Sequence, residues 1–181
     1  TGSGKAQVSF ASPYPGKIIA IDLCDYDGKI ICQKDAFLCA AQGTSVGIEF
    51  SKKMGRGFFG GEGFIMQKLE GDGLAFMHAG GYITEKTLKP GEHLRVDTGC
   101  LVAYSQTVDF DIVFVKGVKN VLFGGEGLFF ASLIGPGKVW VQSLPFNRLA
   151  DRIMSKAGSY GGKEEGSVLG GVGKVLDGDG W

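Results

Sequence analysis

Two glutamates, Glu62 and Glu126, occupy the same place in two glycine-rich segments that lie 64 residues apart. Each stands in a Gly-Gly-Glu-Gly run, where its carboxylate could accept backbone N–H hydrogen bonds and hold a tight loop. Alternatively, the small neighbours leave the carboxylate accessible to a ligand or a partner. An acid/base pair would require the two loops to converge in space. The sequence favours the structural role and keeps contact with a partner or ligand as the alternative.

Phenylalanines precede the same glycines. Phe58 and Phe59 come directly before the first glycine-rich segment, and Phe123 comes directly before the second. We expect these rings to belong mainly to the core. If the protein has an interface, Phe59 and Phe123 are the candidate exposed apolar contacts.

Motifs for catalysis or cofactor binding lack their required context in this chain. The run from Gly55 to Gly60 matches the dinucleotide pattern G-x-G-x-x-G, but an apolar, strand-like segment follows it instead of a helix. The two histidines, His78 and His93, form no His-x-His pair, and His93 after its turn is expected at the surface. No serine lies in a Gly-x-Ser-x-Gly elbow. We therefore assign no catalytic residue, no metal ligand and no cofactor, and we expect a protein that is not an enzyme.

The four cysteines, at positions 24, 32, 39 and 100, form no Cys-x-x-Cys pair, which disfavours zinc and thioredoxin-type chemistry. Cys24 and Cys32 flank an Asp-Gly turn that could bring them together. A two-residue hairpin turn would instead place each of them opposite another residue. We favour reduced thiols that act as small buried hydrophobes, which fits a cytosolic compartment.

Charge and hydropathy exclude several function classes. Lys plus Arg and Asp plus Glu are balanced at 19 each, so the chain lacks the long-range positive field of a general nucleic-acid binder. No stretch approaches the ~20 apolar residues of a transmembrane helix. These features fit a cytosolic protein.

The glycine-rich segments belong to a longer internal repeat. Residues 1–26 match only the last part of a first unit, the second unit runs from residue 27 to 90, and the third runs from 91 to 144. Recurring glycines indicate backbone positions that need positive φ or a close approach. We expect the chain to be one domain that has lost the front of a first unit of roughly 50–80 residues, a length set by the repeat period.

Short apolar segments at a spacing of about ten residues, separated by glycine turns, predict an all-β sandwich or barrel. The expected strands cover residues 17–23, 29–33, 37–41, 45–50, 63–68, 74–79, 94–96, 101–105, 109–115, 127–133 and 138–142. Residues 17–33 are predicted to form a hairpin, and Lys89-Pro90-Gly91-Glu92 a turn. One helix is expected over residues 145–157, followed by a flexible, glycine-rich tail over 158–181.

Four segments of the chain resemble a known family. The run from Phe123 to Phe129, the turn from Leu133 to Gly137, the segment from Val141 to Pro145 and the Pro-Gly-Glu turn at residues 90–92 resemble the altered-inheritance-of-mitochondria protein 24 family. The resemblance implies a fold similar to the tryptophan RNA-binding attenuator protein, a β-sandwich of the double-stranded β-helix type. It supplies no catalytic residues to carry over. The family has bacterial members, and its mitochondrial members are linked to inner-membrane organisation, so the resemblance implies a cytoplasmic protein of bacterial type, or a mitochondrial one if the source is eukaryotic.

Together these observations predict a non-catalytic binding or scaffold module that associates with itself and possesses an unidentified protein partner. Repeated β units present strand edges that another subunit can cover. The alternative is a small-ligand-binding β-sandwich with a pocket between its sheets.

Overall fold

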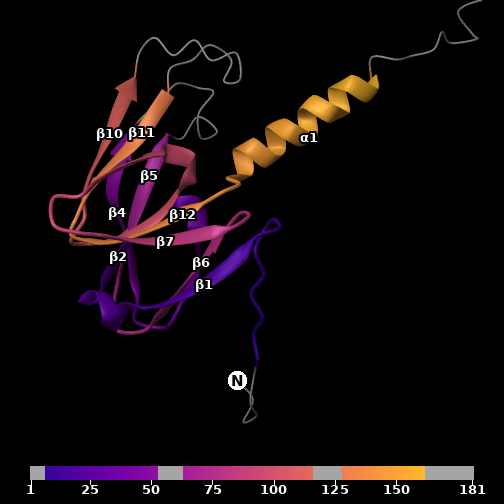
Figure 1. Cartoon of the computed structure of the whole chain (residues 1–181). Helices are drawn as coiled ribbons and strands as arrows, with labels where there is room; N and C mark the ends of the chain where they lie inside the picture. Colours follow the sequence, from indigo (N-terminus) through magenta and orange to yellow (C-terminus); the bar gives the residue numbers. More distant parts are fainter. Residues whose placement is uncertain (1–6, 53–62, 116–127, 162–181) are drawn as a thin grey trace, which may run out of the picture. The chain divides into compact units, whose positions relative to one another are not determined.

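The computed structural model describes residues 7–52, 63–115 and 128–161 (Figure 1). Within those ranges the chain forms twelve β-strands and one α-helix, so the all-β prediction with a C-terminal helix is confirmed. The strands belong to a body that ends at Asn147, and a second unit begins at Arg148.

Eleven of the twelve strands correspond to predicted segments, and their bounds differ by at most two residues at either end. The strands are β1 (Lys17–Asp22), β2 (Lys29–Gln33), β3 (Phe37–Ala40), β4 (Ser45–Lys52), β5 (Phe64–Glu70), β6 (Leu74–Ala79), β7 (Ile83–Leu88), β8 (His93–Asp97), β9 (Leu101–Ser105), β10 (Asp109–Val115), β11 (Leu128–Ile134) and β12 (Gly137–Gln142). The sequence did not predict β7. Short 3-10 helices occur at η1 (Leu23–Tyr26), η2 (Lys34–Ala36) and η4 (Thr98–Cys100).

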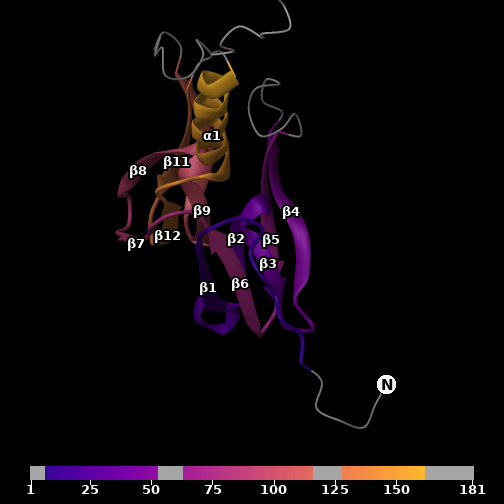
Figure 2. The ribbon, with the colours of Figure 1, turned by 90° about the vertical axis from the view of Figure 1, so that its right-hand side faces the viewer.

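The strands form three antiparallel sheets. Sheet A has the order β1-β6-β3, sheet C has the order β10-β11-β8, and sheet B has the order β4-β5-β2-β9-β12-β7. Figure 1 shows β10 and β11 at one end of the body and β1 and β6 at the other, with β2, β7 and β12 of sheet B between them. Figure 2 shows the same body from the side, with β4 along one margin.

Sheet B is the middle layer because its two faces are buried in two different clusters. Ile30 and Cys32 of β2 pack in a cluster with residues of sheet A, whereas Ile31 packs in a cluster with residues of sheet C. The adjacent strands β2 and β9 are therefore buried on both faces. This explains why their sequences are continuous apolar runs instead of alternating ones.

The segment between β1 and β2 does not form the predicted hairpin. β1 pairs with β6 in sheet A, while β2 pairs with β5 and β9 in sheet B. Helix η1 redirects the chain: Asp22 Oδ1 accepts a hydrogen bond from Cys24 N at 3.0 Å, and Asp27 adopts a left-handed conformation with φ of 52°. All four cysteines are free thiols. The prediction that they are buried holds for Cys32 and is wrong for Cys24, which is exposed, while Cys39 and Cys100 are partly buried.

The Lys89–Glu92 turn has the predicted form. Glu92 N donates to Lys89 O at 2.9 Å, and Gly91 has a φ of 73°. The Glu92 carboxylate accepts a hydrogen bond from Lys89 N at 3.0 Å and pairs with Lys86 Nζ at 3.0 Å. These contacts, the backbone bond first, lower the pKa of Glu92.

The helix α1 (Phe146–Gly161) extends four residues beyond its predicted end, because Gly158 does not stop it. Its apolar residues Leu149, Ala150 and Ile153 recur at the helical period, as predicted. Among the described residues, no helix is both long enough and apolar enough to cross a membrane.

Candidate functional site

The four residues predicted as contacts, Glu62, Glu126, Phe59 and Phe123, lie outside the described residues, as does Phe58. Each of the two segments that contain them connects two strands that pair with each other. The first joins β4 to β5 and the second joins β10 to β11, and each of these pairs is antiparallel.

The described body has a cleft that the sequence did not predict. Its volume is about 200 Å³, and it lies beside the turn after η1, where the start of β12 meets the turn between β9 and β10. The lining residues are Asp25, Tyr26, Asp27, Thr87, Ser105, Gln106, Thr107, Gly137 and Lys138. Most of them carry hydroxyl, amide or charged groups, but the surface that they present to the cleft is mainly apolar, so the cleft could take a small molecule of mixed character.

Lys138 lines this cleft, and an ion pair with Glu85 fixes the position of its side chain. Lys138 Nζ pairs with Glu85 Oε1 at 2.5 Å and lies 5.9 Å from the centre of the Tyr26 ring. Glu85 Oε2 also accepts a hydrogen bond from Trp140 Nε1 at 3.0 Å. The hydrogen bond to Glu85 raises the pKa of Lys138. Lys138 is therefore a charged ammonium at neutral pH, able to attract an anion but not to act as a nucleophile.

Hydroxyl groups also line the cleft, next to Lys138. Ser105 Oγ accepts a hydrogen bond from Lys138 N at 2.9 Å and lies 3.2 Å from Thr107 Oγ1. Gln106 Nε2 donates to Tyr26 O at 3.4 Å, which ties the turn between β9 and β10 to the end of η1. These hydroxyl and amide groups provide hydrogen-bond donors and acceptors at the cleft.

A second polar feature is the buried histidine His78 on β6, which is 2% exposed. Its ring makes an edge-to-face contact with Tyr14, with centroids 4.3 Å apart. Neither ring nitrogen makes a well-formed hydrogen bond to a described residue. A backbone contact with Tyr14 raises the pKa of the ring and so opposes part of the lowering by burial. Burial lowers the pKa of His78 because it disfavours the charged ring. His93, in contrast, is exposed, as predicted.

The environment of His78 predicts a pH-dependent stability. The unfolded chain binds a proton at His78 as the pH falls below about 6.5, the ordinary pKa of a histidine, whereas the folded chain resists protonation. The contribution of His78 to the free energy of unfolding is therefore fully present above about pH 6.5 and is lost as the pH falls below that value. Between about pH 7.5 and pH 5.5 we expect the free energy of unfolding to fall by at most about 1.4 kcal/mol. This is the free energy of one pKa unit, because the unfolded chain takes up its proton over only the lower half of this interval.

Urea unfolding at the two pH values measures this loss. His78→Gln should remove it, because glutamine does not titrate, whereas His93→Gln should retain it. Glutamine already occupies the position 64 residues later, where Gln142 Oε1 accepts from Gly80 N at 2.8 Å and Nε2 donates to Gly99 O at 2.9 Å. An unchanged pH dependence in His78→Gln would contradict the assignment.

Among the described residues, no group of three or more His, Cys, Asp or Glu side chains is placed to hold a metal ion. The burial of Cys32 raises the pKa of its thiol to about 12, so this cysteine is un-ionised at neutral pH.

Comparison with known proteins identifies bacterial relatives of the chain. It is 28% identical over 152 residues to an uncharacterized protein of Streptococcus pyogenes serotype M6, a match that covers 83% of this chain and 59% of that protein. A crystal structure of a Streptococcus pyogenes protein superposes with a TM-score of 0.65 and 25% identity, covering 81% of this chain and 62% of that one. The chain thus spans about three fifths of the length of these relatives.

The family model described as mitochondrial biogenesis AIM24 matches residues 1–144, which include every strand of the body. This confirms the resemblance seen in the glycine-rich motifs. The chain belongs to the mitochondrial biogenesis AIM24 family.

Proposed function

We propose that this protein is a non-catalytic scaffold module that associates with itself through the open edges of its sheets. The observation that carries the proposal is the apolar character of these edges. Ile18 on β1, Val46 and Ile48 on β4 and Phe114 on β10 are 43%, 47%, 66% and 44% exposed, and all lie on strands that pair on one side only among the described strands.

Such edges favour association. A strand with an unpaired side presents a row of backbone donors and acceptors to another chain, and apolar side chains beside it gain from burial. The edge strand β3 has no charged residue and no proline, so it lacks the usual features that prevent pairing. The absence of charge on β3 supports a role in contact with another subunit.

We also propose that the body is built from two copies of one unit. Strands β2, β3, β4 and β5 begin 64 residues before β8, β9, β10 and β11. The pairings β1-β6-β3 and β4-β5-β2 recur as β7-β12-β9 and β10-β11-β8. Within each copy the first strand pairs with the sixth and the second with the fifth. This arrangement supports the double-stranded β-helix type and the similarity to the attenuator protein.

The alternative function is binding of a small ligand. It is favoured by the cleft of about 200 Å³ between Tyr26 and the hydroxyl groups of Ser105 and Thr107. Its volume lies below the ~300 Å³ at which most small-molecule pockets begin, which ranks this function second. Free thiols at all four cysteines support the expected cytoplasmic location for either function.

Mass measured across protein concentration tests the scaffold function. We expect the mass in reducing buffer to rise above the 19.1 kDa of one chain as the concentration goes from submicromolar to high micromolar. Because apolar burial drives the contact, the association should weaken on cooling. A mass that stays at 19.1 kDa throughout would contradict self-association. A monomer whose melting temperature rises with a small ligand would support the alternative.

A further inference from the structure

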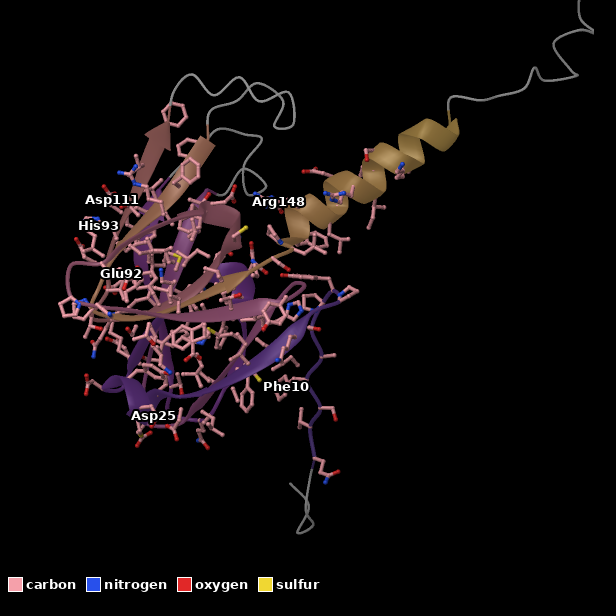
Figure 3. All side chains as sticks on the ribbon, viewed as in Figure 1. Phe10, Asp25, Glu92, His93, Asp111 and Arg148 are labelled. Atoms are coloured by element: carbon pink, nitrogen blue, oxygen red, sulfur yellow. The ribbon has the colours of Figure 1, made fainter. Side chains whose placement is uncertain are left out.

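The stretch that leads into β1 is held to the body mainly at one side chain. Residues 7–16, which we call the N-terminal segment, contain no strand and no helix. Val8 and Phe10 on this segment are 76% and 60% exposed. Figure 3 shows Phe10 between the N-terminus and β1. Tyr14, in contrast, is half-buried, so its contacts decide whether the segment stays on the body.

Tyr14 lies between two other aromatic rings. It contacts His78 of β6 edge to face, with ring centroids 4.3 Å apart, and Phe146 with centroids 4.9 Å apart. Phe146 is the first residue of α1 and belongs to the body that ends at Asn147. The three rings come from three separate parts of the chain. We call Tyr14, His78 and Phe146 the latch.

A glycine lets the backbone of the N-terminal segment approach the same histidine. A Cβ atom added at Gly16 would collide with His78 Nε2 and with the carbonyl oxygen of Ala79. The backbone at Gly16 therefore lies directly against the imidazole. Because Tyr14 covers the ring as well, the 2% exposure of His78 depends on the N-terminal segment being in place.

The next repeat unit uses a different residue at the same place. A shift of 64 residues carries Gly16 onto Gly80 and His78 onto Gln142. Gly80 N donates to Gln142 Oε1 at 2.8 Å, and Gln142 Nε2 donates to Gly99 O at 2.9 Å. The amide is satisfied and has no charge at any pH. His78 replaces it with a ring that titrates and that makes no well-formed hydrogen bond to a described residue.

We propose that protonation of His78 opens the latch and releases the N-terminal segment from the body. A charged imidazolium has two N–H donors, and burying it without hydrogen-bond acceptors is costly. Movement of Tyr14 away from the ring would give both donors access to water. The latch lies within one chain, so this acid response does not depend on the proposed self-association.

The groups around the ring leave His78 as the titrating member of the latch. The charged residues nearby in sequence are Lys17 of β1 and Lys34 and Asp35 of η2, and the last two pair at 3.8 Å. Among the described groups, burial is the main cause of the lowered pKa of His78, and no charged residue contributes to it. Burial, and then Asp35, raise the pKa of Tyr14, so its phenol stays neutral.

The size of the acid response follows from proton linkage. If the ring binds a proton only in the open state, with the ordinary histidine pKa of about 6.5, acid favours that state. The ratio of open to closed molecules then rises by at most about tenfold between about pH 7.5 and pH 5.5. Opening adds Tyr14 to the exposed apolar side chains Val8 and Phe10 on the released segment.

Proton NMR of the histidine rings tests the coupling between Tyr14 and His78. Because linkage is reciprocal, removing the ring that closes the latch should make His78 easier to protonate. Tyr14→Ala should therefore raise the pKa of His78 toward about 6.5. The chain has two histidines, and the exposed His93 in sheet C, away from the N-terminal segment, provides an internal reference (Figure 3).

Two matched variants make this titration specific. Tyr14→Phe keeps the ring contact and should leave the pKa of His78 near its wild-type value. Phe10→Ala removes an exposed ring from the same segment and should also leave that pKa unchanged. If Tyr14→Ala does not change the pKa of His78, or if Phe10→Ala changes it equally, the inference is wrong.

Fluorine NMR tests whether the segment moves. The five tyrosines can be replaced by fluorotyrosine, and the signal of residue 14 is the one that Tyr14→Phe removes. The shift of this signal between H₂O and D₂O reports exposure of the ring to solvent. We expect this isotope shift to grow from about pH 7.5 to pH 5.5, toward that of the exposed Tyr82.

The same measurement on histidine variants assigns the response. His78→Gln, which introduces the residue of the equivalent position, should keep the isotope shift of Tyr14 constant with pH. His93→Gln should retain the wild-type response. A ring that stays covered in acid would contradict opening of the latch. An equal response in His78→Gln would assign the movement to another group and would also overturn the inference.

Discussion

Trp140→Ala is expected to lower the free energy of unfolding by about 3–5 kcal/mol, the range for a buried tryptophan replaced by alanine. Trp140 is 2% exposed and is among the largest fully buried side chains of the body. It packs edge to face on Tyr26, with ring centroids 5.5 Å apart, and belongs to the cluster between sheets A and B. A deletion here leaves a cavity where the second half of the chain covers the core of the first.

Two comparison variants separate packing from hydrogen bonding. Trp140→Phe keeps most of the ring volume but loses the 3.0 Å hydrogen bond to Glu85, so we expect a smaller loss, about 1–2 kcal/mol. Phe114→Ala removes an aromatic ring that is 44% exposed and should cost less than Trp140→Ala. Urea denaturation of the reduced protein measures all three. A loss below about 1 kcal/mol for Trp140→Ala would contradict the core assignment.

The fold class could be predicted from the sequence because most strands have a clear local pattern. β2 and β9 are short apolar runs, and β10 alternates Asp109 and Asp111 with the inward-facing Phe110 and Ile112. β7 was missed because its middle residues are all polar and exposed, as expected for an edge strand. Its apolar residues stand at its two ends, where Leu88 is buried in one core cluster and Ile83 packs against the other.

Strand pairing could not be predicted in the same way. The Asp27-Gly28 sequence favours a local hairpin, but burial of Ile21 against one sheet and of Ile30 and Ile31 within another overrides it. The antiparallel pairing of β2 with β9 connects residues more than 70 positions apart in the chain. Local periodicity carries no information on such a partner, because the register depends on the tertiary structure.

The cleft was missed for a related reason. Tyr26, Ser105 and Lys138 come from three distant segments, and each is an ordinary residue in its own surroundings. Their shared position follows from the pairing of β12 with both β9 and β7. In contrast, the conspicuous glutamates Glu62 and Glu126 were identifiable by repetition alone, and their roles stay predictions.

Gly137→Ala is expected to have the second large effect, a loss of about 3 kcal/mol or more. Gly137 begins β12 with a φ of 146°, a conformation that other residues rarely adopt, and such strain costs about 1–3 kcal/mol. A Cβ atom at this position would also collide with Ser105 Oγ and would lie 2.6 Å from Thr107 Oγ1 and from Val108 Cγ2. Overpacking of this kind adds about 1–3 kcal/mol.

Gly91→Ala provides the matched control, because Gly91 also has positive φ, 73°, but has no atom within 4 Å of an added Cβ. It should show conformational strain alone, about 1 kcal/mol. The difference between the two variants in thermal or urea unfolding therefore reports the collision with the turn between β9 and β10 together with the greater strain of an alanine at φ of 146°. Equal losses would mean that this turn moves aside. A much larger loss for Gly137→Ala would show that the recurring glycine is required by close approach, as its repetition in the sequence predicts.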